Sequence, residues 1–278
     1  MSDENWLEIR QNIDNCIKSG QIDKARRDLN SINIVKVPKS EKIHLANLCR
    51  RTGLLNLGLK FLAKIIRDDV EGIVAAHPNE KAEYGVLLQR IGAVDEAKKI
   101  LGNIDSTETP VAELYLAFCH FNQWNYAAAI EPLNKYLSLI DQDSYAFTVG
   151  QVNLAAALVN VRDFERADQL LAELLETTTR KKMNLLRSNC LEILSQLEIQ
   201  KENFEKALRL LDQSESELTS HQVLQKFFIH KWKSISRASM DPEKVDWQAL
   251  REEAFRINHP ESQREIDYYE AVIDQNYN

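Results

Sequence analysis

A small residue recurs along the chain at intervals that fit a stack of helical hairpins. The separations are 33, 39, 32, 38 and 40 residues, and a leucine stands four positions later each time. Two helices approach most closely at one point, where only Ala or Gly leaves room for both backbones. We call these small residues the crossing residues. They are Ala25, Gly58, Ala97, Ala129, Ala167 and Ala207, and the leucines are Leu29, Leu62, Leu101, Leu133, Leu171 and Leu211.

Each crossing residue is expected on the second helix of a hairpin, with a first helix upstream. The inner face of a first helix shows a large, a small and another apolar residue at i, i+1 and i+4, as at Leu154, Ala155 and Leu158. Only 8 glycines and 6 prolines occur in 278 residues, too few for the many tight turns of a sheet protein. New hairpins are expected to begin at Pro38, Pro78 and Pro110. The sequence therefore predicts an all-α fold.

The repeated positions resemble those of tetratricopeptide-repeat proteins. Besides the crossing residues, the matching features are large-small pairs, turn glycines and aromatics, namely Tyr84-Gly85, Leu116-Ala117, Gly20, Gly53, Gly92, Tyr126, Phe164 and Phe204. The resemblance covers roughly residues 6–218. It implies a right-handed superhelical solenoid of about six antiparallel hairpins. The family's early tryptophan is missing, and several separations exceed its usual ~34 residues. Ser195 and Glu198 occupy apolar positions, so the sixth hairpin is expected to be degenerate.

Residues 219–278 do not continue the spacing, so the sequence divides into repeats at 1–218 and C-terminal helices at 219–278. One helix is expected to start with Asp241 as its cap and Pro242 in its first turn. A second is expected to carry Ile266, Tyr269 and Ile273 on one face. These helices either cap the last hydrophobic face of the solenoid or couple it to a domain beyond residue 278.

Composition and motifs point away from catalysis and nucleic-acid binding. The net charge is −7, which disfavours nonspecific binding to nucleic acid. Phosphate-binding glycine motifs, zinc-site spacings and nucleophile elbows do not occur, so we expect neither an enzyme nor a cofactor. Cys119-His120 falls on a packed helix. Four scattered cysteines and an N-terminus without an apolar signal segment indicate a cytoplasmic protein.

Two long segments lack charged residues, residues 114–130 and 144–161. The second has nearly the length of a membrane span, but it contains Gln151, Asn153 and Asn160. We therefore interpret both as buried central hairpins, with no membrane insertion.

The concave surface of such a stack, lined by first helices, is the expected binding surface. A row of cationic and then amide residues stands seven positions before the crossing residues: Lys18, Arg51, Arg90, Asn122, Asn160 and Gln200. Asn and Gln both donate and accept hydrogen bonds, which suits a peptide backbone. Chance is the alternative explanation, because hairpin ends are usually polar.

An apolar face is expected in the same groove. It holds Val111, Leu114, Tyr115, Phe118 and Phe121, and one hairpin later Val149, Val152, Ala156 and Val159. Either a partner or the chain's own C-terminal helices would cover such a patch. In addition, residues 36–67 hold eight Lys or Arg and one acid, which favours an acidic partner surface.

The sequence thus predicts a non-enzymatic scaffold that grips a peptide or protein segment, with an acidic part, in its concave groove. The alternative is a regulatory module that senses a peptide or small ligand and signals to an output domain or partner. Homo-oligomers remain possible. The predicted partner-binding residues are Arg51, Arg90, Tyr115, Phe118, Phe121, Asn122, Asn153 and Asn160.

Overall fold

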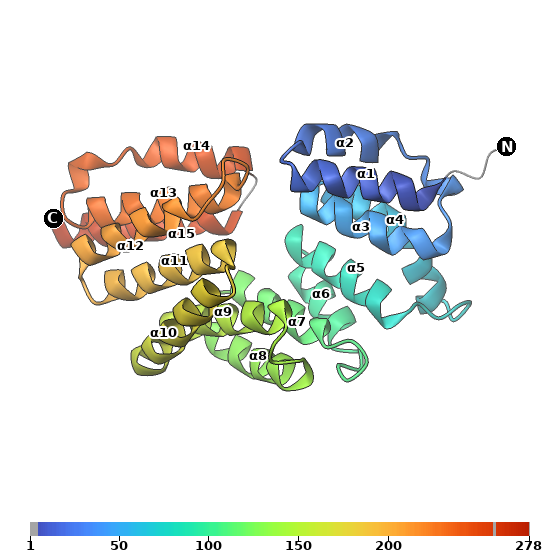
Figure 1. The fold of residues 1–278 in the computed structure, drawn as a ribbon, viewed down its shortest axis with the longest axis horizontal. Coiled ribbons are helices and arrows are strands. Elements are labelled where there is room, and N and C mark those ends of the chain that lie inside the picture. Colours follow the sequence, from blue (N-terminus) through green and yellow to red (C-terminus); the bar gives the residue numbers. More distant parts are fainter. Residues whose placement is uncertain (1–4, 258–259, 278) are drawn as a thin grey trace. The chain divides into compact units, whose positions relative to one another are not determined.

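The computed structural model describes residues 5–257 and 260–277, and none of them forms a strand. Antiparallel helix pairs follow one another along the chain (Figure 1). The chain divides into two compact units, Met1–Ile140 and Asp141–Asn278, each of which is described by itself. The all-α, hairpin-built fold class is therefore confirmed.

The described part of unit 1, residues 5–140, contains four helix pairs and one short 3-10 turn. They are α1 (Trp6–Lys18), α2 (Ile22–Ser31), η1 (Ile34–Lys36), α3 (Lys39–Thr52), α4 (Leu55–Val70), α5 (Pro78–Arg90), α6 (Val94–Leu101), α7 (Val111–Asn122) and α8 (Tyr126–Leu139). The first helices α1, α3, α5 and α7 each pack on the next, so they form one layer. The second helices α2, α4 and α6 each pack between two of them, and α8 packs on α7.

Unit 2 repeats this arrangement. It contains α9 (Tyr145–Asn160), α10 (Phe164–Arg180), α11 (Asn184–Gln200), α12 (Phe204–Ser216), α13 (Val223–Ala238), η2 (Pro242–Lys244), α14 (Trp247–Ile257) and α15 (Pro260–Tyr277). The helices α9, α11, α13 and α15 form its first-helix layer.

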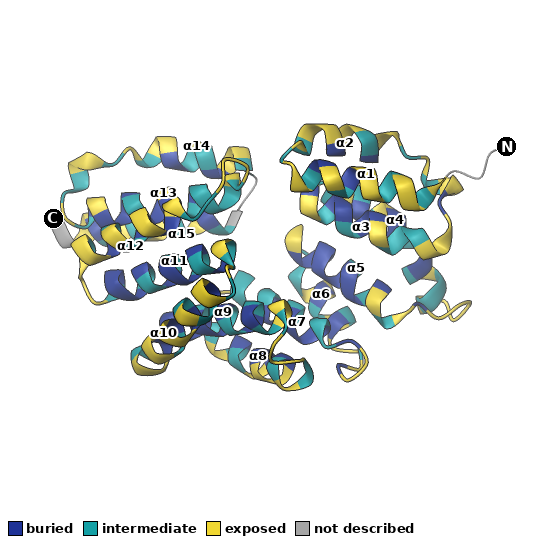
Figure 2. Ribbon diagram, viewed as in Figure 1, coloured by how far each residue is buried: buried dark blue, intermediate teal, exposed yellow. Residues whose placement is uncertain are grey.

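The crossing residues lie where the sequence places them. All six are buried on second helices, and the leucines that follow are at most 1% exposed (Figure 2). A Cβ added to Gly58 would lie 3.3 Å from the carbonyl oxygen of Ala46 on α3 and 3.0 Å from Leu87 on α5. Close helix packing therefore explains the small residue, as predicted.

The turn between the two helices of a hairpin contains one residue in the left-handed region. Gly20, Gly53 and Gly92 hold this position with φ of 76°, 78° and 90°. In the later hairpins non-glycine residues hold it, namely Trp124, Arg162 and Glu202, with φ between 56° and 62°. Glycine alone adopts this conformation without a steric cost. The same turn geometry thus occurs in hairpins that have no glycine at this position.

The sixth hairpin is intact, although two polar residues occupy its core positions. Ser195 and Glu198 are buried on α11. The Ser195 hydroxyl donates to the Glu192 carbonyl, and the Glu198 carboxylate accepts from Asn203 at 2.8 Å and Lys206 at 2.9 Å. Because these polar groups are satisfied, the expected degeneration of this hairpin is wrong.

The helix expected after Asp241 begins later than predicted. Pro242–Lys244 forms a separate 3-10 turn, and Val245 is extended. Asp246 accepts a hydrogen bond from the Ala249 amide at 2.9 Å, so it occupies the N-terminus of α14. The start at Asp241 is therefore wrong, since a better-placed cap lies five residues on.

The two uncharged segments belong to the central hairpins. They coincide with α7–α8 and α9. Among the described helices, none combines the length and the apolar character that crossing a membrane requires.

Candidate functional site

The predicted polar row lies at the ends of first helices. Lys18, Arg90, Asn122, Asn160 and Gln200 are the last residues of their helices, and Arg51 is one residue before the end of α3. The position seven residues before each crossing residue therefore marks the end of a first helix, to within one residue.

Arg51 is engaged within unit 1. Its guanidinium lies 2.5 Å from the Asp14 carboxylate on α1, and Lys18 lies 2.6 Å from the same group. Hydrogen bonds from Lys18 and Arg51 hold the pKa of Asp14 below its ordinary value. An acidic partner group would therefore compete with Asp14 for Arg51. Arg90, at the end of α5, is exposed.

Asn122 is also engaged within unit 1. Its side-chain oxygen accepts from Gln89 Nε2 at 2.7 Å, and its Nδ2 donates to the Gln89 carbonyl at 3.2 Å. The two amides thereby link the ends of α5 and α7. A peptide that used Asn122 would have to share or replace these bonds.

An aromatic stripe follows the first-helix layer along α7. The ring centroids of Tyr115 and Phe118 lie 6.1 Å apart, those of Phe118 and Phe121 6.4 Å, and those of Phe121 and Tyr126 5.4 Å. Tyr115, Phe118 and Phe121 are only partly buried, so part of each ring remains accessible. Burial raises the pKa of the Tyr115 phenol above its ordinary value.

A partly buried ion pair supports one end of this stripe. Arg50 on α3 donates to Glu83 on α5 at 2.8 and 3.3 Å, and Asn47 donates to Glu83 at 3.4 Å. The Arg50 guanidinium carbon also lies 5.8 Å from the centre of the Tyr115 ring, in cation–π geometry. Sequence reasoning missed this pair, because its members are 33 positions apart and each stands in an ordinary amphipathic pattern.

Asn153 and Asn160 lie on one stripe of α9 in unit 2. Each donates from Nδ2 to the carbonyl four residues before it, to Val149 at 2.8 Å and to Ala156 at 2.9 Å. The stripe consists of Val149, Asn153, Ala156 and Asn160, all of which are partly exposed. Among the described residues, no partner is found for the side-chain oxygen of either asparagine. This stripe therefore presents amide acceptors beside small apolar side chains.

The apolar face predicted for the groove is narrower than expected. Leu114 is 6% exposed, Val152 5% and Val159 0%, so these three residues belong to the core. The reason is that α7 packs on α5, α6 and α8, and α9 packs on α10 and α11. Contacts with these neighbours bury part of the predicted face and leave a partly exposed stripe on each helix, at i, i+4, i+7 and i+11.

Unit 2 holds a buried charged cluster that the sequence did not reveal. Lys231 on α13 is 3% exposed and pairs with Glu265 on α15. Gln196 donates to Glu192 on α11 at 2.7 Å, and burial raises the pKa of Glu192, an effect that Lys231 opposes. Each charge lies on a different helix, so no local motif could have shown the cluster.

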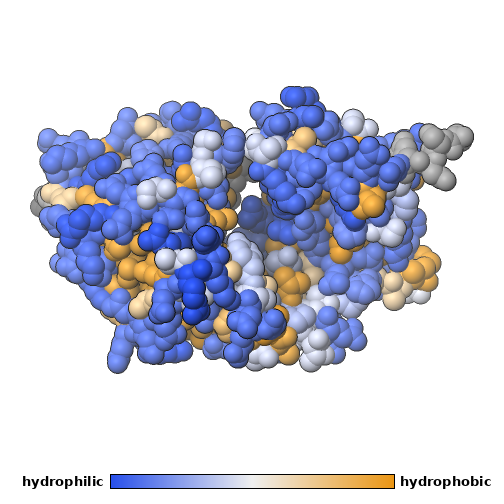
Figure 3. Space-filling model, in the orientation of Figure 1, coloured by the Kyte–Doolittle hydropathy of each residue, from blue (hydrophilic) through white to orange (hydrophobic). Residues whose placement is uncertain are grey.

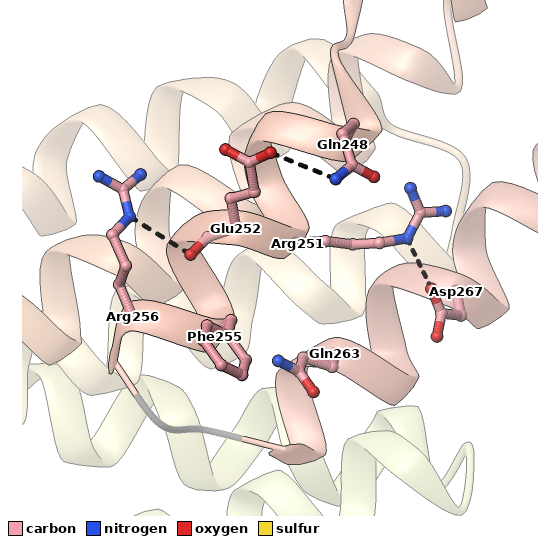
Figure 4. Close-up of a pocket in the computed structure, with 7 residues that line it drawn as sticks. All are labelled: Gln248, Arg251, Glu252, Phe255, Arg256, Gln263 and Asp267. Atoms are coloured by element: carbon pink, nitrogen blue, oxygen red, sulfur yellow. Dashed lines mark hydrogen bonds and ion pairs between the residues drawn. The ribbon is translucent and has the colours of Figure 1, made fainter.

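An open pocket of about 610 Å³ lies along α14 and α15 (Figure 4). Phe255 extends into it toward Gln263, and Arg251 on its far side reaches Asp267 at 2.9 Å. Because Asp267 and Glu270 both pair with Arg251, this arginine has its charge balanced within the unit.

Cys119 of the Cys119-His120 pair is unsuited to act as a nucleophile. Cys119 is fully buried, and burial raises its pKa to about 11. Burial also lowers the pKa of His120. A protonated thiol is a poor nucleophile. Within the described part of the chain, no group of three or more possible ligands could hold a metal ion.

Comparisons with known proteins connect the chain to helical-repeat structures. No family model and no curated protein matches the sequence. A crystal structure of a Rap protein complexed with competence and sporulation factor is 11% identical, with a TM-score of 0.56 over 95% of this chain and 80% of that one. TPR-like repeats of a putative kinesin light chain from Podosopora anserina are 16% identical, with a TM-score of 0.51 over 66% and 96%. The chain thus has a tetratricopeptide-repeat-like fold, a solenoid of helical hairpins.

Proposed function

We propose that this protein is a non-enzymatic interaction scaffold that binds a peptide or an extended protein segment on its first-helix layers. The observation that carries the proposal is the accessible aromatic stripe of Tyr115, Phe118 and Phe121. Partly exposed aromatic rings in a continuous row are costly to leave in water and are preferred anchors at protein interfaces.

The α9 stripe is the second binding element that we propose. The side-chain oxygens of Asn153 and Asn160 have no partner among the residues that the structure describes, and Val149 and Ala156 provide small apolar contacts beside them. An extended peptide backbone offers N–H groups that such acceptors can bind. The spacing of seven residues, two helical turns, places both amides on the same side.

Arg51 and Arg90 are proposed to receive acidic groups of the partner at the cationic end of the polar row. Arg51 already pairs with Asp14, so a carboxylate of the partner would replace the Asp14 carboxylate rather than add a new ion pair. The contribution of Arg51 to the affinity is therefore expected to be small. Asn122 is proposed to act through its pairing with Gln89, by holding the end of α7 in place beside the aromatic stripe.

The fold comparison supports a binding role. The Rap protein, which is similar in fold over most of this chain, was crystallised with competence and sporulation factor. We extend to this chain only the idea that such a stack of hairpins binds another molecule. We further propose that residues 219–278 cap the stack, because Ile266 and Ile273 are buried and Tyr269 packs edge-on against Trp232 at 5.4 Å.

The proposal is tested by selecting ligands from a random peptide library on the purified protein and measuring their affinity by calorimetry. Phe118→Ala should weaken the selected peptides at least about tenfold, because a central aromatic anchor contributes ~2 kcal/mol or more. Asn153→Ala and Asn160→Ala should each weaken them less. Phe255→Ala is the matched control, since this aromatic is 76% exposed on α14, outside both stripes.

Thermal unfolding of each variant separates binding from stability. If Phe118→Ala unfolds several degrees earlier while the folded fraction binds as before, the ring is part of the core and the proposal is wrong. Selection of peptides whose affinity is unaffected by every stripe variant would also contradict it.

A further inference from the structure

Two connecting segments of the chain lie together at one end of the α3–α4 hairpin in unit 1. The first is η1 with the segment that leads into α3, and the second is the segment from α4 to α5. Val37 from the first and Ala76 from the second are buried in the same hydrophobic cluster, together with Ile65. Because α3 begins where its antiparallel neighbour α4 ends, these two connections lie at the same end of the hairpin.

Four aliphatic side chains at this end point into solvent. Their exposed fractions are 91% for Val35, 79% for Val70, 63% for Ile73 and 51% for Val74. Figure 3 shows hydrophobic surface at the right edge of the molecule, beside the connection from α4 to α5. Single exposed aliphatic residues are common, but four on adjoining connections form a patch.

Four cations lie at the same end of the hairpin as these aliphatic residues. Lys36 precedes α3, Lys39 and Lys42 lie in its first turn, and Arg67 lies in the last turn of α4. No ion pair joins any of these four to another described residue. We call the four aliphatic residues and these four cations the basic-aliphatic edge.

The neighbouring acids are mostly neutralised by other cations. Glu41 pairs with Arg10 at 3.4 Å, Asp68 with Lys64 at 2.6 Å and Asp69 with Lys81 at 2.9 Å. Glu71 remains as an exposed acid in the second connection, and Asp28 lines a pocket together with Lys36. The edge therefore keeps a local positive charge although the whole chain carries −7.

We propose that the basic-aliphatic edge docks on an anionic membrane surface. The lysines and arginine would lie among lipid headgroups, while the valines and isoleucine enter the boundary of the acyl region. All helices stay outside the bilayer in this arrangement. The edge is separate from the aromatic stripe, so docking leaves the proposed peptide-binding surface available.

The residue types favour a lipid surface over a protein partner. Lysine is depleted in protein interfaces and valine is rare among their energetic anchors, whereas aromatic residues, methionine and arginine are enriched. A lysine ammonium ion is a point charge that needs no fixed partner geometry. Protruding aliphatic side chains also need a surface that deforms around them, which fluid lipid provides.

The test is co-sedimentation of the full chain with phosphatidylcholine vesicles that either contain or lack phosphatidylserine. We expect binding only to the anionic vesicles, and weaker binding as salt rises, because the screening length falls from about 10 Å at 0.1 M to about 3 Å at 1 M. Lys39→Glu with Arg67→Glu should reduce the binding at least about 25-fold, since each cation near the surface accounts for about fivefold. Ile73→Ser with Val74→Ser should reduce it about tenfold.

The matched control is Lys24→Glu with Lys99→Glu. Both lysines are exposed on unit 1, on α2 and α6, and the change in net charge is the same. Vesicle binding should be nearly unaffected in this variant. Equal loss in both charge variants would show that net charge alone attracts the protein, and it would overturn the proposal. No binding to anionic vesicles at low salt would also overturn it and would assign the edge to a protein partner.

Discussion

The Arg50 guanidinium donates two hydrogen bonds to the Glu83 carboxylate, at 2.8 and 3.3 Å, and thereby joins α3 to α5 within the first-helix layer of unit 1. The Glu83 side chain is 8% exposed and that of Arg50 22%. Few other polar contacts in this layer are so enclosed, and the pair lies directly beside Tyr115. The stability of the layer and the position of the aromatic stripe therefore depend on the same two charges.

Removing one member of this pair should destabilise unit 1 strongly. Glu83→Ala leaves Arg50 without its counter-charge, and we expect a loss of about 2–3 kcal/mol in the free energy of unfolding. This is somewhat less than the ~3–5 kcal/mol of a fully enclosed pair, because Arg50 reaches solvent. Urea denaturation measures the change. The double variant Arg50→Met with Glu83→Ala should be less unstable than the summed losses of Arg50→Met and Glu83→Ala, and a double variant that loses the full sum would contradict this explanation.

An arginine at a crossing residue should unfold its hairpin. Ala129 on α8 is completely buried, so Ala129→Arg must overpack the crossing, at a cost of about 1–3 kcal/mol, and bury a charge as well. Ala167→Arg should behave in the same way on α10. Ala127→Arg is the control, because Ala127 is exposed two residues away on α8. Thermal unfolding followed by circular dichroism should show a large shift for the first two variants and almost none for the third.

Glycine should stabilise a turn that lacks it. Glu202 holds the left-handed turn position of its hairpin with φ of 61°, so Glu202→Gly should raise the free energy of unfolding by about 1 kcal/mol. Gly92→Ala should lower it by a similar amount. No atom beyond its chain neighbours would lie within 4 Å of the new Cβ, so the loss would be conformational rather than steric. Chemical denaturation of both variants checks the opposite signs.

The stability of unit 2 should depend on the charge of Glu192. Burial raises the pKa of this carboxyl above its ordinary value of 4.5, so the folded protein favours the protonated form. The contribution of this carboxyl to the free energy of unfolding is therefore fully favourable below pH 4.5. It is lost as the pH rises through the pKa that the carboxyl has in the folded protein. Glu192→Gln should stabilise the protein at neutral pH, and the gain should disappear in mild acid. A gain that is constant across this range would show that the carboxyl does not titrate differently on folding.

The repeat, the hairpins and the turn positions could be predicted from the sequence, because they depend on local rules. A small residue permits a close crossing, a leucine one turn later lies on the same face, and a glycine marks a left-handed turn. These rules placed Ala97, Leu101 and Gly92 correctly. They also placed Asn122 and Asn160 at the ends of first helices.

Only the tertiary structure decided which faces of the first helices remain open and which charges are paired. Val152 and Val159 are buried because several neighbours enclose α9, and no periodicity in α9 itself reveals how many neighbours it has. Arg51 meets Asp14 across 37 positions, and Lys231 meets Glu265 across 34. Periodicity determines how each helix divides into faces, whereas the stacking of hairpins determines what each face meets, and that depends on contacts between residues distant in sequence.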